Sequence, residues 1–256
     1  MSYFKVPFYD AIAQKQYSNI VRWEKLGFNP EVKNVDEDMW AYGGVYTFPA
    51  AATKMDIVSS DDKDGKTSSP NSVGARTVTI YGLGATYNEL SETITLDGVT
   101  PVETTNSYLR INNMRVATVG SENDPAGNLT LSEANGTTYR YGYIRAGFTR
   151  ARNCIYTVPL GKTLYITSAL YSAVTGAVGH WTRFTLLATY DDKSDTVLPA
   201  GFYMPYTELS IVETSFTRDY MIPLKLPATT DLRIRVVCDG TVTMLCQCVL
   251  RGYVVS

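Results

Sequence analysis

Histidine is almost absent from this sequence of 256 residues, because His180 is its only example. A Ser-His-Asp or Cys-His catalytic arrangement would have to use that residue, which lies in the stretch GAVGHWTRF without a G-x-S-x-G motif. A single histidine also cannot complete the common zinc sites. We therefore expect His180 to lie in a loop or an interface rather than in a catalytic or metal site.

An excess of charge of one sign is also missing. The sequence has 23 Lys and Arg against 25 Asp and Glu, which gives a net charge of −2. This balance argues against a nucleic-acid-binding protein. The stretch YRYGYIRAGFTRAR (139–152) is locally basic and aromatic, but packing of Tyr and Arg on a sheet face explains it better. Long apolar runs are lacking too, so we expect no membrane span.

Cysteine is scarce and its spacing fits no metal or redox motif. Cys154, Cys238, Cys246 and Cys248 form no C-x-x-C pair. The first residues, MSYFKVPFYD, lack a charged segment followed by an apolar run, so we expect no signal peptide. The cysteines are then expected to be reduced core residues of a protein that is made in a cytosol and not secreted.

Three further patterns resemble chemical motifs only superficially. DDKDGK (61–66) lacks the acidic residues that an EF-hand needs at other positions. GLGATY (82–87) lacks the third glycine of a dinucleotide-binding loop. Glu89 and Glu92 are a carboxylate pair in a polar stretch, for which solvated charges are the default interpretation. We predict no enzyme activity, no catalytic residues, no cofactor and no metal.

Residues 1–44 differ from the rest, because they are rich in aromatics without a regular pattern. We predict an extended, partly helical N-terminal arm, with a helix within 9–26, Asp10 as its N-cap and Gly27 as its end. Such a segment packs onto its own domain or onto a neighbour. The predicted interface residues are Tyr3, Phe4, Phe8, Tyr9, Trp23, Phe28 and Trp40.

From Val45 onward, short alternating runs are separated by Gly, Asn, Asp and Ser, which is the signature of β-strands. Asp97-Gly98, Asn135-Gly136 and Asp239-Gly240 predict hairpin turns. The fold class is therefore all-β. We predict a small antiparallel β domain at 45–120 and a jelly-roll-like β-sandwich at 121–256, with VPLGK (158–162) as a corner between strands.

Several segments follow one another in a characteristic order. IVRWEKLGFNP, DMWAYGGVYTFP, GARTVTIYGL and YNELSETITLDG lie in the first half, and VPLGKT and LPATTDLRIRV lie in the second. In this order the sequence resembles uncharacterised virion proteins of tailed bacteriophages, often aquatic ones. Their segments typically read W-E-K-x-G-x-N-P, W-x-G-G-x-Y-x-F-P, G-A-R-T-V-x-I-x-G-L and I-P-A-G-K-T.

The resemblance covers most of the chain and implies a structural component of a phage particle, without a known catalytic residue. The first hypothesis is a capsid decoration (cement) protein, which binds the major capsid protein or other virion proteins through the arm and forms a homotrimer or homodimer. The alternatives are a tail, baseplate or neck component, or a module that binds a glycan. We expect no nucleic-acid or membrane partner.

Overall fold

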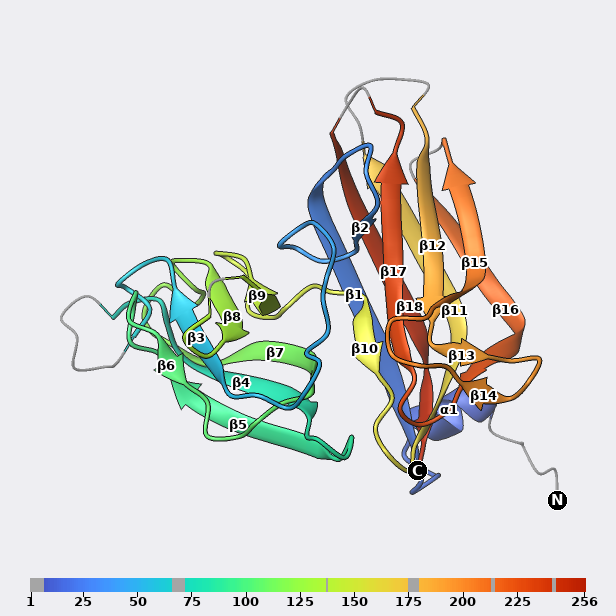
Figure 1. Cartoon of the computed structure of the whole chain (residues 1–256), viewed down its shortest axis with the longest axis horizontal. Helices are drawn as coiled ribbons and strands as arrows, with labels where there is room; N and C mark the ends of the chain where they lie inside the picture. The colour runs from blue at the N-terminus through green and yellow to red at the C-terminus, as the bar shows by residue number, and fades with distance from the viewer. Residues whose placement is uncertain (1–6, 66–71, 137, 175–179, 213–214, 241–242) are drawn as a thin grey trace, which may run out of the picture.

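The computed structural model describes residues 7–65, 72–136, 138–174, 180–212, 215–240 and 243–256. Strands account for 56% of the chain and helix for 3%, which confirms the prediction of an all-β protein. Figure 1 shows two lobes side by side, with the C-terminus in the larger one. We call them the large lobe and the small lobe.

The large lobe contains a short helix and two antiparallel sheets. One sheet has the order β1-β18-β11-β16, and the other has the order β10-β17-β12-β15 with β2 also paired to β17. A separate two-stranded ribbon is formed by β13 and β14. The elements are α1 (Phe8–Ala13), β1 (Ile20–Val32), β2 (Glu37–Asp38), β10 (Ile155–Thr157), β11 (Thr163–Val174), β12 (Thr182–Ala188), β13 (Tyr190–Asp191), β14 (Thr196–Val197), β15 (Met204–Ile211), β16 (Ser215–Leu226), β17 (Asp231–Cys238) and β18 (Met244–Val255).

One hydrophobic core lies between these two sheets and takes side chains from both. In β12, Thr182, Phe184 and Leu186 are buried while the residues between them are partly exposed, as expected for a strand with one buried face. The rings of Tyr171 on β11 and Phe184 have their centroids 5.0 Å apart across the core. The alternating pattern of the sequence therefore produces two sheets that share an interior.

The small lobe is made by consecutive strands that form two further sheets around a second core. Their orders are β6-β3-β8-β9 and β5-β4-β7. The strands are β3 (Met55–Ser59), β4 (Ala75–Leu83), β5 (Glu89–Thr95), β6 (Val102–Glu103), β7 (Arg110–Val119), β8 (Leu129–Glu133) and β9 (Arg140–Ile144). Asn135 adopts φ of 57° between β8 and β9, and these strands pair, so the Asn135-Gly136 hairpin is confirmed.

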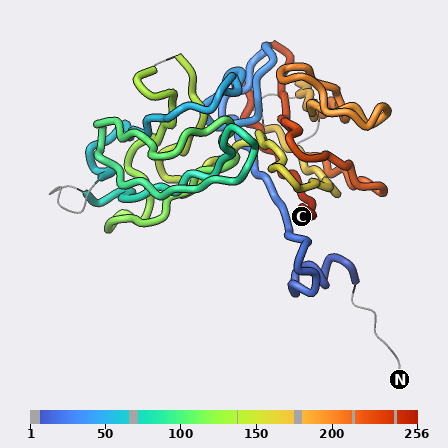
Figure 2. Tube along the Cα trace, turned by 60° about the horizontal axis from the view of Figure 1, so that its bottom comes forward, coloured from blue at the N-terminus to red at the C-terminus, as the bar shows by residue number. Residues whose placement is uncertain are grey.

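The small lobe interrupts a single edge strand of the large lobe. β2 and β10 pair with consecutive parts of β17, since Asp38 lies opposite Arg235 and Ile155 opposite Arg233. The amide of Cys154 donates to the carbonyl of Met39 at 2.8 Å. The chain therefore leaves the large lobe and returns to it at neighbouring residues, and all of the small lobe lies between these two points (Figure 2).

The expected N-terminal arm and domain limits need correction. The helix predicted within 9–26 is limited to α1, which has Pro7 rather than Asp10 as its N-cap. Residues 20–32 instead form β1, which pairs with β18 along most of its length, because tertiary pairing overrides local helix propensity. The limit at 120/121 also divides a sheet, since β8 pairs with β3.

Two of the three predicted hairpins are turns between strands of different sheets. Gly98 has φ of 61° and Gly240 has φ of 53°, so both dipeptides form tight turns. However, β17 and β18, which flank Asp239-Gly240, belong to opposite sheets of the large lobe, and β5 and β6 are likewise in different sheets. The corner at 158–162 is confirmed, because Gly161 has φ of 75° between β10 and β11.

Candidate functional site

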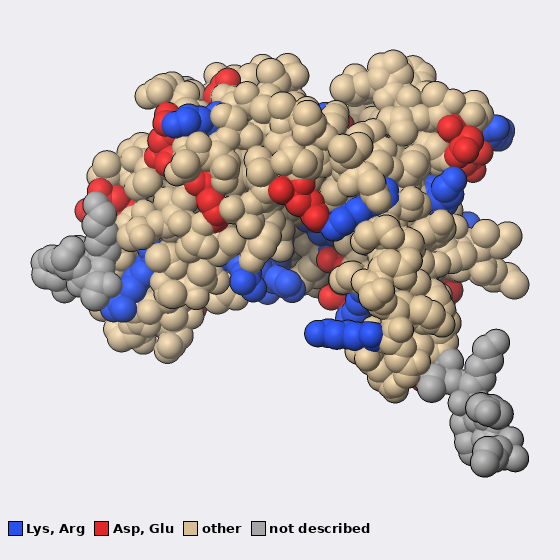
Figure 3. All heavy atoms as spheres, turned by 90° about the horizontal axis from the view of Figure 1, so that it is seen from below, with Lys and Arg blue, Asp and Glu red and all other residues tan. Residues whose placement is uncertain are grey.

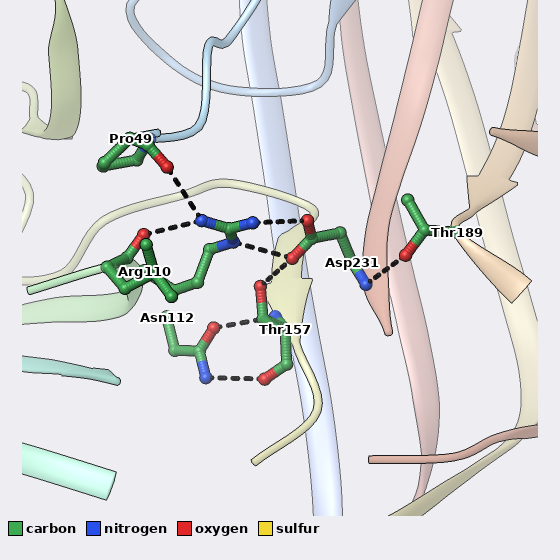
Figure 4. Close-up of polar contacts among 7 residues, drawn as sticks. Pro49, Arg110, Asn112, Thr157, Thr189 and Asp231 are labelled. Carbon is green, nitrogen blue, oxygen red and sulfur yellow. Dashed lines mark hydrogen bonds and ion pairs between the residues drawn. The ribbon is translucent and has the colours of Figure 1, made fainter. Parts of the chain in front are cut away.

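The strongest concentration of buried polar groups lies at the seam between the two lobes (Figure 4). Arg110, at the start of β7, faces Asp231, at the start of β17. Its Nε lies 2.8 Å from Oδ1 and its Nη2 lies 2.9 Å from Oδ2 of Asp231. The two side chains are only 3% and 4% exposed. The pair is therefore a buried, bidentate ion pair that joins the small lobe to the large lobe.

Neighbouring groups complete the hydrogen bonds of this pair. Nη1 of Arg110 donates to the carbonyl of Pro49 at 3.0 Å. Thr157 Oγ1 donates to Asp231 at 2.5 Å, and the amide of Asp231 donates to Thr189 Oγ1 at 2.8 Å. The charge of Asp231 is thus held by several donors, and neither member of the pair is left as an available acid or base.

Asn112 on β7 makes two hydrogen bonds with the backbone of Thr157 on β10. Its Nδ2 donates to the carbonyl of Thr157 at 2.9 Å, and the amide of Thr157 donates to its Oδ1 at 2.8 Å. Burial alone would lower the pKa of the Arg110 guanidinium, but the hydrogen bonds and charge of Asp231 raise it above its usual value. Arg110 therefore stays charged, and this geometry is that of a structural brace.

A second buried ion pair lies beside the first, between β17 and the β2 region. Arg233 Nη1 lies 3.2 Å from Asp38 Oδ2, and the amide of Tyr46 donates to the same oxygen at 2.7 Å. Burial raises the pKa of Asp38, and the charge of Arg233 offsets this only in part. Because Tyr46 belongs to the core of the small lobe, this pair also fastens one lobe to the other.

Lys25 supplies a third connection, from β1. Its Nζ donates to Asn153 Oδ1 at 2.7 Å and to the carbonyl of Asn112 on β7. Burial lowers the pKa of Lys25 from 10.5 to about 7. A neutral amine still has two N–H donors for its two acceptors, so the connection survives loss of the proton.

Three sizeable cavities open beside these contacts. One of 440 Å³ lies at the seam between Lys25, Tyr156 and Glu89, and one of 490 Å³ lies between Arg110, Arg233 and Tyr203. A third, of 560 Å³, lies between α1 and the β1-β18-β11-β16 sheet. The first two are lined by residues of both lobes, so only the third of these is outside the seam.

Three of the aromatic residues predicted to form an interface are buried in the chain itself. Trp23 packs against Tyr156 in the large lobe, with ring centroids 5.1 Å apart. Trp40 packs against Tyr46 in the small lobe at 5.2 Å, and Phe28 is also buried. This part of the prediction is corrected, because these side chains lie on a paired strand or at a core and not on a free arm.

The other predicted interface residues lie at the N-terminal end. Phe8 and Tyr9 are on α1 and are exposed, although the ring of Phe8 also contacts Tyr253 on β18 at 5.3 Å. Tyr3 and Phe4 lie outside the described residues. An interface at α1 therefore stays a prediction that rests on Phe8 and Tyr9.

The remaining sequence candidates have structural partners. Asp64, in the DDKDGK stretch, is buried and accepts backbone amides of Ala75, Ala126 and Gly127 at 2.6, 3.0 and 2.8 Å. Glu92 accepts the backbone amides of Thr105 and Asn106 at 2.8 and 3.2 Å. In the part of the chain that the structure describes, no group of acidic, Cys or His side chains could hold a metal ion.

His180 and the cysteines lie where structural residues are expected. His180 Nδ1 lies 2.8 Å from Asp239 Oδ1, at the end of the large lobe. All four cysteines are buried and none forms a disulfide, and burial raises the pKa of the Cys246 thiol to about 12. A thiol of this kind is protonated near neutral pH, which suits a core residue and not a nucleophile.

Sequence patterns did not identify two features of the surface and the seam. Arg110 and Asp231 stand in alternating strand runs, where nothing local shows that they are buried against each other. Met221 and Ile222 also lie in such a run, yet they are among the most exposed apolar side chains of the described residues. The neighbouring Pro223 disturbs strand pairing and is the one sequence signal that could have indicated the exposure of these two side chains.

Surface charge follows the composition. Figure 3 shows basic and acidic side chains interspersed over the face seen from below, without a field of one sign. No helix in the described part of the chain is long and apolar enough to cross a membrane.

Comparison with known proteins gives limited similarity. No protein-family model matches the sequence, and no curated protein matches it. A structure of infectious bursal disease virus Gt strain aligns with 98% of this chain and 78% of its own, at 10% identity and a TM-score of 0.24. The VP2 subviral particle of the same virus aligns with 98% and 81%, at 9% identity and a TM-score of 0.21. TM-scores of this size do not establish a common fold.

Proposed function

We propose that this chain is a non-enzymatic structural protein of a virus particle and that its large lobe is a jelly roll. The support comes from the strand order. With β2 and β10 counted as one interrupted strand, the eight main strands in chain order form sheets 1-8-3-6 and 2-7-4-5. This is the arrangement of an eight-stranded jelly roll, an architecture of viral capsid and lectin domains. That strand order is the observation on which the proposal depends.

The seam supports a structural role over a catalytic one. Arg110 and Asp231 form an ion pair across the two lobes, and Arg233 and Asp38 bond the backbone of Tyr46 in the small-lobe core. These contacts hold the small lobe in a fixed position. A pair of lobes braced in this way suits a protein that must keep its shape within an assembly.

Within the particle, we propose a decoration (cement) role, located in the virion after synthesis in the host cytoplasm. Phe8 and Tyr9 on α1 are exposed aromatic side chains, which supports anchoring to the major capsid protein through this helix. Binding to neighbouring capsid subunits would stabilise the assembled state by mass action. A homotrimer or homodimer is the expected form.

Two alternatives remain and have different observable consequences. A tail, baseplate or neck component would use the same helix to dock onto a ring of another protein. A glycan-binding module would use partly exposed aromatic rings, such as the stacked Tyr165 and Tyr253 with centroids 5.1 Å apart. Saturable binding to a glycan array by the purified monomer would favour the second alternative.

The test is the number of copies per particle, measured by quantitative mass spectrometry against the major capsid protein. A ratio near one, or a simple fraction such as one third, supports decoration of the capsid lattice. A ratio of a few per cent assigns the protein to the tail or neck. Absence from purified particles refutes a virion role altogether.

A further inference from the structure

Strand β16 carries an apolar projection on an open sheet edge. Its pairing with β11 shifts between Ser168, which lies opposite Asp219, and Ile166, which lies opposite Leu224. Residues 220–223 therefore bulge out of the ladder, and Figure 1 shows β16 bending away at the right edge. Within this bulge Met221 is 101% exposed and Ile222 is 84% exposed. We call these two residues the knob.

Exposure of this degree is costly unless another surface covers it. Bulges, charges and proline usually protect an edge strand against pairing, and the neighbouring Asp219 and Pro223 fit that role. Two large apolar side chains at the tip of the bulge do not protect the edge, because exposed apolar surface favours association with another surface. Met is also enriched in protein interfaces, where its flexible chain fills irregular pockets.

The 560 Å³ cavity beside β16 has complementary properties, and we call it the groove. Its lining includes Ile12 and Ala13 of α1 and Tyr253 of β18, which give it apolar walls. Arg22 and Arg251 also line it, but both pair with Glu24, at 2.9 and 3.6 Å. The groove is thus an apolar recess next to an apolar projection.

Knob and groove are adjacent on the same chain. Asp219 and Tyr220 line the groove and directly precede Met221 in β16. A two-fold axis near this point would bring each knob to the groove of the other copy. Such an arrangement forms a closed, isologous interface.

We propose that two copies of this chain associate through these surfaces, with Met221 and Ile222 of one copy inserted into the groove of the other. The occupant is a second copy because the apolar projection and the apolar recess belong to one polypeptide and lie side by side. The inference deepens the proposed function, on which it rests, by naming the contact through which copies assemble.

The first measurement is the oligomeric state of the full chain by sedimentation velocity over a range of concentrations. The wild-type protein should form a dimer. Ile222→Asp should weaken dimerisation at least tenfold, because it places a charge in an apolar recess. Leu160→Asp is the matched control, since Leu160 is 58% exposed in the corner before β11, and it should dimerise as the wild type does.

The second measurement identifies the receiving surface. Met221→Cys protein and Ala13→Cys protein are mixed and mildly oxidised, which permits crosslinks only between copies. The native cysteines are buried and should not compete. A mixed disulfide should form at least tenfold faster than with the Leu160→Cys control. Circular dichroism verifies that each variant is folded.

Three results would overturn the inference. These are a wild-type monomer at all concentrations, a dimer that Ile222→Asp leaves intact, and a dimer without preferential crosslinking of positions 13 and 221. Binding of a glycan in the groove of a protein that stays monomeric would likewise overturn the inference. Copy number separates this outcome from the proposed function, because a monomer found at lattice stoichiometry refutes the self-association and leaves the virion role standing.

Discussion

At the scale of single residues, Arg110 and Asp231 can stay charged in the interior only because each has the other as a partner. Replacing Arg110 by Met should leave the Asp231 carboxylate buried with the hydroxyl of Thr157 as a donor but no counter-charge. Loss of one member of a buried pair typically costs about 3–5 kcal/mol of unfolding free energy. Urea denaturation measures this directly.

An exposed ion pair serves as the control for this prediction. Lys54 and Glu103 are 2.7 Å apart with side chains 47% and 45% exposed, so Lys54→Met should cost under about 1 kcal/mol. Equal costs for Lys54→Met and Arg110→Met would contradict the assignment of the seam pair as a buried brace.

Lys25 gives the protein a predictable response to pH. Because burial lowers its pKa from 10.5 to about 7 in the folded state, the folded protein binds fewer protons than the unfolded chain between these values. Stability should therefore rise with pH, by at most about 1.4 kcal/mol per pH unit. The useful window is about pH 7 to 7.5, because unfolded cysteines, with a pKa of about 8.5, begin to ionise above it and oppose the rise.

The readout is the slope of unfolding free energy against pH, not its absolute value. Lys25→Met should remove this rise, whereas Lys54→Met at an exposed position should retain it. A wild-type slope that Lys25→Met leaves unchanged would show that another group titrates in this window.

At the scale of elements, α1 and β1 contribute unequally although they are consecutive in the chain. α1 buries only Ala11 and Ile12, so deletion of residues 1–16 should preserve cooperative thermal unfolding. Deletion of residues 1–29 removes most of β1 and its pairing with β18, and the large lobe should lose its cooperative transition. Calorimetry of both truncations tests this, and cooperative melting of the longer deletion would contradict it.

Sequence patterns predicted strands well and their sheets poorly. The alternation in DLRIRVV correctly indicates β17, and Asn135-Gly136 correctly indicates the hairpin between β8 and β9. Asp239-Gly240 has the same local signal, but its flanking strands diverge into opposite sheets. A turn dipeptide fixes a local change of direction, whereas sheet membership depends on partners far away in the sequence.

The aromatic residues within 1–44 show the same limit of sequence-based prediction for the interface. Trp23 has a large apolar side chain, which suits an interface as well as a core. Burial against Tyr156 follows only from the pairing of β1 with β18, across almost the whole sequence. The seam pair was missed for the same reason, since Arg110 and Asp231 meet only after both lobes have formed.

At the scale of the whole molecule, the neighbouring entry and exit points make the small lobe separable. Replacing residues 43–150 by a short glycine linker should leave a folded large lobe, because Cys154 already bonds to Met39 across the junction. The Asp231 carboxylate would then be hydrated by water, and would not be buried without a counter-charge. Far-ultraviolet circular dichroism with a single thermal transition checks this, and an unfolded product would show that the large lobe depends on the small one.

The pairing of β1 with β18 also has a consequence for biosynthesis. β18 lies between β1 and β11 in the sheet, although all the other strands of the chain come between it and β1 in the sequence. All strands of the small lobe have their partners within one contiguous stretch, so that lobe can fold while translation continues. β1 is made well before β18, its ladder partner. The nascent chain therefore carries an open, partly apolar strand until β18 is made, which is the period when chaperone binding would protect it most.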